Sequence, residues 1–323
     1  MALQERREQV AWLTTLSPLG IRGRVASFTH DRWLPVLVWI GIPCAAGLLV
    51  GHVAERRDLG AAVLRPGDRS TRRPRLGSAV ALSAYLQRRG VLGWATALGA
   101  IGALLGATGA GVIDNARAGR LDGGLLGARM DAGDAVVAYF AYLGTLVALA
   151  VGVQGVLAVQ RATTEERSGL SELVRDSGRP AWSPLAATWV VAVAQVGLSL
   201  IMAAAAASLV ASGMIDAPDV GGIAWRLVLG QAPGVLVLAG AAAALAGLRP
   251  GLGWLAWVLL AAGAVATLLG GLLDLPTWLA DLSPLGHAPT AGWLSTAQLL
   301  LLGVSVALAS AGIRAAAARD LAA

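Results

Sequence analysis

The sequence predicts an all-α fold, a polytopic membrane helix bundle of about seven transmembrane helices. The chain is 56% hydrophobic and only 14% charged, whereas a soluble domain usually has about 25% charged residues. Its apolar residues form runs of about 20, the length that a helix needs to cross a bilayer core. These runs are continuously apolar rather than alternating, which excludes a transmembrane β-barrel. Helices are therefore the remaining way to satisfy the backbone in lipid.

Seven apolar runs lie at about 33–54, 91–113, 134–160, 184–212, 223–246, 252–273 and 293–312. Arginine placement predicts their orientation, because cytoplasmic loops carry an excess of positive charge. The loop after the first run is rich in arginine and is expected inside: Arg56, Arg57, Arg65, Arg69, Arg72, Arg73 and Arg75. Alternation then places 161–183 inside, and 114–133, 213–222 and 274–292 outside. The basic residues 1–32 disagree with this scheme, which puts them outside.

Several kinds of chemistry are not expected. All 25 basic residues are arginine, so the chain has no standard phosphate-binding loop, which needs a lysine. Cys44 is the only cysteine, and His30, His52 and His287 are far apart in the sequence, so we expect no metal site, catalytic residue or cofactor. Short arginine clusters between apolar runs also argue against a nucleic-acid partner, which favours a continuous basic face.

The pentapeptide LSPLG occurs twice, at Leu16–Gly20 and at Leu282–Gly286. A tryptophan, an apolar run and an Arg-Asp-Leu tripeptide follow each copy in the same order, roughly 265 residues apart. The pattern favours an internal duplication, although both copies would also suit unrelated turns. We therefore expect residues 1–77 to comprise an outer loop, a leading helix and a basic cytoplasmic linker, the end of a preceding repeat. Residues 78–323 would form a six-helix unit whose last outer loop contains Ser283, Pro284 and Gly286.

No run has a charged residue near its centre, which argues against an ion-coupled secondary transporter. The runs do contain Gln154, Gln195 and Gln231. These side chains suit either hydrogen bonds between helices or a candidate substrate path. A row of glycines follows one face of the second run and favours close helix packing, within this chain or at a subunit interface: Gly99, Gly102, Gly106 and Gly109.

The cytoplasmic stretch ATTEERSGLSELVRDSGRPAWSPL begins at Ala162. Thr163 and Glu166 have the spacing of a capping box, which predicts that a short helix starts there. Gly178 and Pro180 would end it. Such a charged amphipathic helix either lies in the headgroup region or docks onto a soluble partner.

This stretch resembles the coupling loop of ABC-2 type exporter permeases, through Glu165, Glu166, Gly169, Glu172 and Leu173. The segment SAVALSAYLQRRGVLGW is similar to the elbow helix that precedes the first span of such units, here 78–90 with Tyr85, Arg88 and Arg89. The LSPLG loop and the RRDL helix exit resemble the C-terminal half of polyketide-antibiotic exporter permeases. Members of that subgroup usually have two six-helix units, whereas this chain has one unit and a leading helix.

The resemblance implies a bacterial plasma-membrane permease subunit without its own ATPase site. A separate ABC ATPase subunit would bind at 161–183 and drive export of a hydrophobic cargo, such as a polyketide antibiotic or a drug-like compound. It also implies a second permease half or a homodimer partner in the bilayer. The alternative is a membrane-embedded lipid- or isoprenoid-processing enzyme. That enzyme would need acid clusters such as D-D-x-x-D, whereas 162–185 offers glutamate pairs.

Overall fold

The computed structural model describes residues 77–119, 134–167, 182–271, 275–288 and 295–319, together with Gly178, Pro180 and Leu273. The chain divides into two compact units, Met1–Pro74 and Arg75–Ala323, and every described residue lies in the second. The predicted leading helix 33–54, the first LSPLG copy and most of the loop at 168–181 lie outside the described residues.

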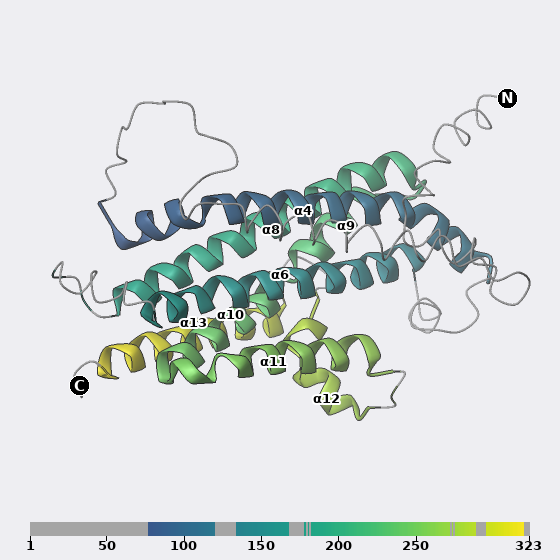
Figure 1. The fold of residues 1–323 in the computed structure, drawn as a ribbon. Helices are drawn as coiled ribbons and strands as arrows, with labels where there is room; N and C mark the ends of the chain where they lie inside the picture. Colours follow the sequence, from purple (N-terminus) through teal and green to yellow (C-terminus); the bar gives the residue numbers. More distant parts are fainter. Residues whose placement is uncertain are drawn as a thin grey trace, which may run out of the picture. The chain divides into compact units, whose positions relative to one another are not determined.

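The described part of the chain contains six helices that are long and apolar enough to cross a membrane. They are built from α4 (Ala79–Arg117), α6 (Ala135–Arg167), α8 (Ser183–Met214), α9 and α10 (Val220–Leu229 and Ala232–Leu248), α11 (Trp254–Ala264) and α13 (Thr296–Arg319). In Figure 1, α4 and α8 form one side of the bundle, α6 runs through the middle, and α10, α11 and α13 form the other side. These helices confirm the predicted all-α bundle.

Three of these elements depart from the expected boundaries. The segment 78–90, expected as a separate elbow helix, forms the first turns of the continuous helix α4. The run 223–246 is broken at Gly230 and Gln231, between α9 and α10, where Pro233 follows and lacks a backbone N–H. The sixth run begins as the 3-10 helix η2 (Pro250–Leu252) and ends as the π-helix η3 (Val265–Leu269).

Small residues let the helices approach closely. On α4, a Cβ added at Gly106 would lie 2.8 Å from the backbone oxygen of Ala207 in α8, and one at Gly102 would overlap the Ala203 carbonyl. On α10, Gly240 faces the backbone of Ser305 in α13 in the same way. In lipid there is no hydrophobic driving force between helices, so close van der Waals contacts of this kind stabilise their association.

The main core lies where α6 meets α4, α8 and α9. Its largest fully buried side chains include Phe140, Leu143, Leu98, Leu200 and Leu227. A second, alanine-rich cluster lies further along α6, around Val156 and Val159, and joins α6 to α10. The bundle is therefore centred on α6, the helix that leads into the predicted coupling loop.

Candidate functional site

The predicted coupling residues fall partly within α6. Glu165 and Glu166 lie in its last turn, whereas Gly169, Glu172 and Leu173 lie outside the described residues. Thr163 does not begin a new helix, because α6 runs through it to Arg167. Its hydroxyl donates to the carbonyl of Gln160, 2.6 Å away, within the same helix. The capping-box interpretation is therefore wrong: the apolar helix continues through the polar residues at its end.

Charged side chains connect the end of α6 to two other helices. Glu165 forms an ion pair with Arg161 one turn earlier, with 3.9 Å between Oε1 of Glu165 and Nε of Arg161. Glu166 lies 3.8 Å from Arg319, in the last turn of α13. Arg319 also donates to the carbonyl of Ala246 in α10, at 3.4 Å. One guanidinium thus bridges α6, α10 and α13.

The same end of α6 is bonded to α11. The side-chain amide of Gln160 donates to the carbonyl of Gly253 at 2.7 Å, and the Trp257 indole donates to the amide oxygen of Gln160 at 3.1 Å. Both hydrogen bonds join segments more than 90 residues apart in the sequence. They fix the start of α11 against the end of α6.

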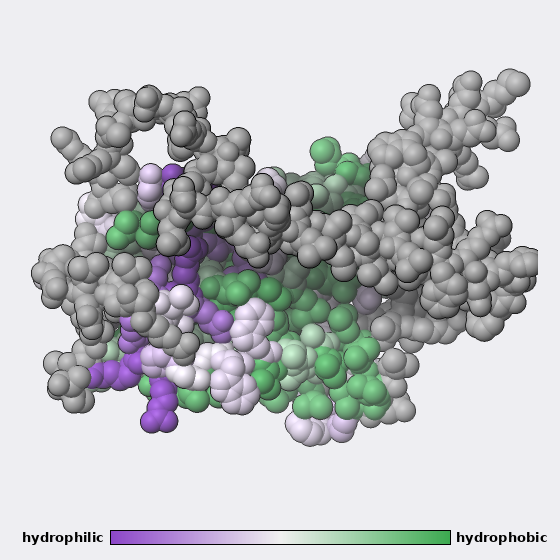
Figure 2. All heavy atoms as spheres, in the orientation of Figure 1, coloured by the Kyte–Doolittle hydropathy of each residue, from purple (hydrophilic) through white to green (hydrophobic). Residues whose placement is uncertain are grey.

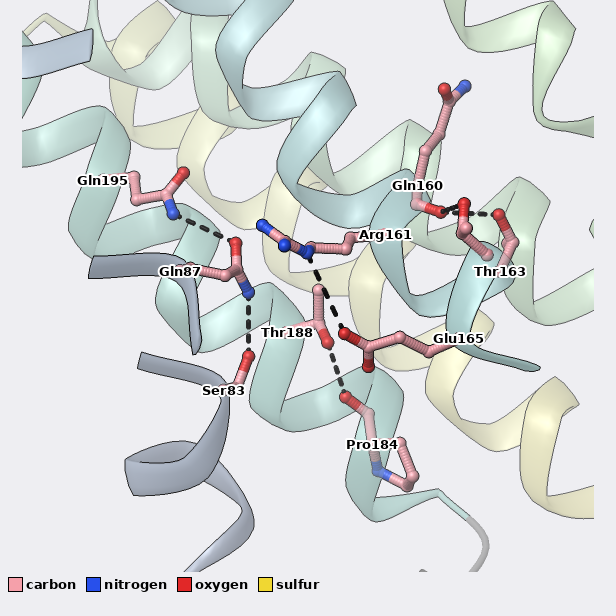
Figure 3. A network of polar contacts seen from close by, with 10 residues as sticks. Ser83, Gln87, Gln160, Arg161, Thr163, Glu165, Pro184, Thr188 and Gln195 are labelled. Carbon is pink, nitrogen blue, oxygen red and sulfur yellow. Dashed lines mark hydrogen bonds and ion pairs between the residues drawn. The ribbon is translucent and has the colours of Figure 1, made fainter. Parts of the chain in front are cut away.

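A pair of glutamines joins α4 to α8 at this end of the bundle (Figure 3). Gln195 donates to Gln87 at 3.0 Å, and Gln87 donates to Ser83 at 2.8 Å. Both glutamines are buried, with 5% and 3% of their surfaces exposed. A buried amide whose partner is a second amide is satisfied without water. Gln195, predicted to face another helix or a substrate path, therefore bonds another helix.

A cavity of about 50 Å³ lies between the starts of α4 and α8 and the end of α6. Ser83, Glu165, Pro184 and Thr188 are among its lining residues. Figure 3 shows Glu165 near the Thr188–Pro184 turn of α8. We call the polar residues of this region the end cluster: Ser83, Gln87, Gln160, Arg161, Glu165, Glu166, Gln195 and Arg319.

Hydrophilic residues gather at this end of the bundle, and apolar residues make up most of the rest of the coloured surface in Figure 2. The exposed residues Arg88 and Tyr85 of the predicted elbow lie on α4 nearby, with the guanidinium carbon 3.5 Å from the ring centroid. Arg88 also donates to the Tyr85 carbonyl at 3.0 Å, and Arg89 is exposed beside it. This pairing keeps the Arg88 charge against the surface of α4.

Two predicted path residues are buried without matched partners. In the described part of the chain, neither amide atom of Gln154 has a hydrogen-bond partner, nor does the amide nitrogen of Gln231. Their exposed fractions are 1% and 2%. An unmatched amide in an apolar interior is costly, which marks these positions as able to receive a polar group.

The four predicted packing glycines are all buried in α4. Gly99, Gly102 and Gly106 face Met202, Ala203 and Ala207 of α8, and Gly109 faces Tyr139 of α6 and Ile215. Their row thus lies against helices of this chain.

At the opposite end of the bundle, the second LSPLG copy is folded onto the helices. Its Leu282 ends α12 (Thr277–Leu282), and Pro284–Gly286 form the 3-10 helix η4. Ser283 is buried, donates to the carbonyl of Gly263 at 3.2 Å and lies 2.7 Å from the Thr267 hydroxyl. The Pro284 carbonyl lies directly against Gly234 of α10.

Five members of the end cluster were not predicted as site residues from the sequence: Ser83, Gln87, Gln160, Arg161 and Arg319. Gln87 stands among small and polar residues that read as an interfacial segment, and its pairing with Gln195 joins residues 108 positions apart. Arg319 had one usable signal, since it belongs to the repeated Arg-Asp-Leu word. Its contact with Glu166 depends on how the helices pack and follows from no local pattern.

The bundle of apolar helices defines a multi-pass membrane protein, and its similarity to known proteins identifies it as a bacterial permease of the ABC-2 type. Residues 76–316 match the family described as "Multidrug efflux system permease Rv1217c, C-terminal domain", and the chain belongs to that family. It is also 28% identical, over 320 residues, to the multidrug efflux system permease protein Rv1217c of Mycobacterium tuberculosis (strain ATCC 25618 / H37Rv). That alignment covers 96% of this chain and 57% of the relative.

These comparisons confirm the resemblance to ABC-2 type permeases and the placement in a bacterial membrane. They place the chain among transport permeases rather than among lipid-processing enzymes. The chain spans a little over half the length of the relative, 57%.

Proposed function

We propose that this chain is the permease part of an ATP-driven exporter of hydrophobic compounds, drug-like molecules or polyketide antibiotics, energised by a separate ABC ATPase. The position of Glu165 and Glu166 carries the proposal. Both carboxylates lie at the end of the central helix, with 35% of each side chain exposed. They can meet basic residues of a soluble partner while α6 connects them to the rest of the bundle.

The end cluster would transmit movement from the ATPase to the permease when ATP drives closure of the ATPase dimer. Gln160 and Arg319 join the end of α6 to α10, α11 and α13. A push on this end therefore reaches several helices at once, because the bonded ends move together. The given sequence has no lysine and so holds no standard phosphate-binding loop, which agrees with a separate ATPase subunit in the proposal.

The coupling surface that we propose continues from α6 into the loop at 168–177. Gly169, Glu172 and Leu173 complete the sequence pattern there. Glutamates suit basic residues of the ATPase, and Leu173 would supply an apolar anchor. On the permease side, Tyr85, Arg88 and Arg89 of α4 would hold the adjacent surface at the membrane interface.

We place the cargo path beside Gln154, Gln195 and Gln231. The unmatched amides of Gln154 and Gln231 would bond to polar groups of a passing cargo or to accompanying water. A second permease half, or a second copy of this chain, would complete the path. The greater length of the relative, of which this chain covers 57%, supports that partner.

The test changes Glu165, Glu166 and Glu172 to alanine together. We expect at least an order-of-magnitude loss of an ABC ATPase that co-purifies with the tagged full chain, measured by quantitative mass spectrometry. Asp216→Ala is the matched control, because Asp216 is exposed at the other end of α8. Equal ATPase recovery with the triple variant and the wild type would refute the coupling assignment.

A further inference from the structure

A large cavity lies at the end of the bundle opposite the end cluster. Its volume is about 550 Å³, within the range of about 300–1,000 Å³ that is typical of small-molecule sites. It lies between the start of α6, the π-helix η3 and the α12–η4 segment. The larger side chains among its described lining residues belong to Tyr142, Thr145, Thr267, Leu275, Asp281 and Leu285.

Most of the residues that line the cavity are small. Seven of the described lining residues are alanine or glycine, whose small side chains leave room for a ligand. A π-turn, a rare device that is frequent at functional sites, contributes Ala266 and Thr267. Leu285 is almost fully buried, with 1% of its surface exposed, and gives the cavity an apolar wall.

The uncharged polar groups of the walls are engaged within the protein. Thr145 donates to the carbonyl of Ala141 at 3.0 Å, and the Thr267 hydroxyl lies 2.7 Å from that of Ser283. A ligand therefore does not have to supply hydrogen bonds to them. This arrangement favours a largely apolar molecule.

Asp281 gives the cavity its charge. It is the only ionisable acid or base among the described lining residues apart from the phenol of Tyr142. Asp281 is exposed and makes no ion pair with a described residue. An unneutralised carboxylate at the edge of an apolar cavity attracts a cation and repels an anion. The Tyr142 ring adds an aromatic face that also suits a cation.

We propose that this cavity binds hydrophobic organic cations, with the charge held near Asp281 and the apolar body between α6 and η3. The proposal rests on the proposed export function and names the class of cargo at its outer site. The α12–η4 segment, fastened through Ser283 to Gly263 and Thr267, forms one side of the site and keeps Asp281 in place.

Binding can be measured on the full chain in nanodiscs, without ATP or any ATPase. The probes are methyltriphenylphosphonium, a hydrophobic cation, and the similarly sized neutral triphenylphosphine oxide. Each is measured separately by equilibrium dialysis, with empty nanodiscs subtracted. Because no ATPase is present, a failure of ATP-driven export and a failure of this binding are distinguishable.

We expect the wild type to bind the cation on the order of tenfold more tightly than the neutral probe, and Asp281→Asn to remove that preference. Asp216→Asn, which changes an exposed acid outside the cavity, should keep it. Equal affinity for both probes in the wild type, or an unchanged preference in folded Asp281→Asn, would overturn the proposal.

A second variant tests the cavity without changing charge. Gly271 lines the cavity, and a Cβ added there meets no atom within 4 Å, so we expect Gly271→Leu to occupy space at the cavity without a clash at its Cβ. Gly271→Leu should weaken the binding of both probes by at least fivefold, as expected when an apolar pocket loses several contacts. Gly213→Leu is the matched control, since Gly213 is equally open and does not line the cavity. The proposed site would be contradicted if Gly271→Leu and Gly213→Leu weakened probe binding equally, or if neither variant weakened it.

Discussion

Arg319, in the last turn of α13, lies 3.8 Å from Glu166 at the end of α6 and also donates to the carbonyl of Ala246 in α10. Three helices that are far apart in the sequence therefore meet at one guanidinium. This contact lies beside the carboxylates that we propose as the ATPase docking point. It connects that point physically to two helices on the far side of the bundle.

The ion pair itself should contribute little to stability. About a third of each side chain is exposed, and exposed pairs contribute about 0–1 kcal/mol. A double-mutant cycle with Glu166→Gln and Arg319→Gln should give a coupling of at most about 1 kcal/mol in reversible SDS unfolding. A coupling several times larger would show that the pair is desolvated and has a structural role. We expect transport to fall more than stability.

The glycine contact between α4 and α8 should be intolerant of added volume. Gly102→Leu puts side-chain atoms where the Ala203 backbone lies and should destabilise the chain by about 1–3 kcal/mol or more. Gly111→Leu is the control on the same helix, because a Cβ there meets nothing within 4 Å. Thermal unfolding of both variants in detergent measures the difference. Similar melting temperatures would rule out the close contact.

The paired glutamines should show strong non-additivity. Gln195→Met leaves the buried oxygen of Gln87 without this donor, which should cost about 1–3 kcal/mol. In the Gln87→Met/Gln195→Met double variant neither amide remains, so much of that loss should be recovered. Ser83 loses its bond from Gln87 in the double variant, which sets the residual cost. Strictly additive unfolding free energies would show that the two side chains do not bond.

Ser283 should hold the η4 segment against the π-helix. Ser283→Ala removes the bonds to Gly263 and Thr267 and should cost about 1 kcal/mol. Hydrogen exchange should become several-fold faster at Gly286, whose amide bonds to the Ser283 carbonyl. Exchange at the end cluster serves as the internal control. Unchanged exchange at Gly286 would show that other contacts hold the segment.

The sequence predicted the bundle well because apolar runs report helix length and burial directly. The six described spans overlap the runs expected at 91–312. Helix ends were less predictable. The polar residues around Thr163 predicted the start of a new helix, whereas α6 continues through them to Arg167. Propensity and local capping patterns cannot show whether the preceding helix has already ended.

The candidate sites were predictable only in part. Glu165 and Glu166 could be singled out because they belong to a local pattern that resembles an ABC-2 coupling loop, and their coupling role stays a prediction. Arg319, Gln87 and Asp281 gain their importance from neighbours on other helices. Asp281 in particular was one acid among several in an outer loop, and its cavity exists only once α6, η3 and α12 are packed together.

The central claim is ATP-driven export by this chain, and accumulation of a hydrophobic fluorescent dye in inside-out vesicles from the host tests it most directly. Vesicles containing the chain should accumulate dye with ATP but not with a non-hydrolysable analogue. Vesicles from a strain that lacks the chain should accumulate several-fold less, and the Glu165→Ala/Glu166→Ala variant should not restore the difference. Equal ATP-dependent accumulation with and without the chain, across a panel of such dyes, would contradict the account.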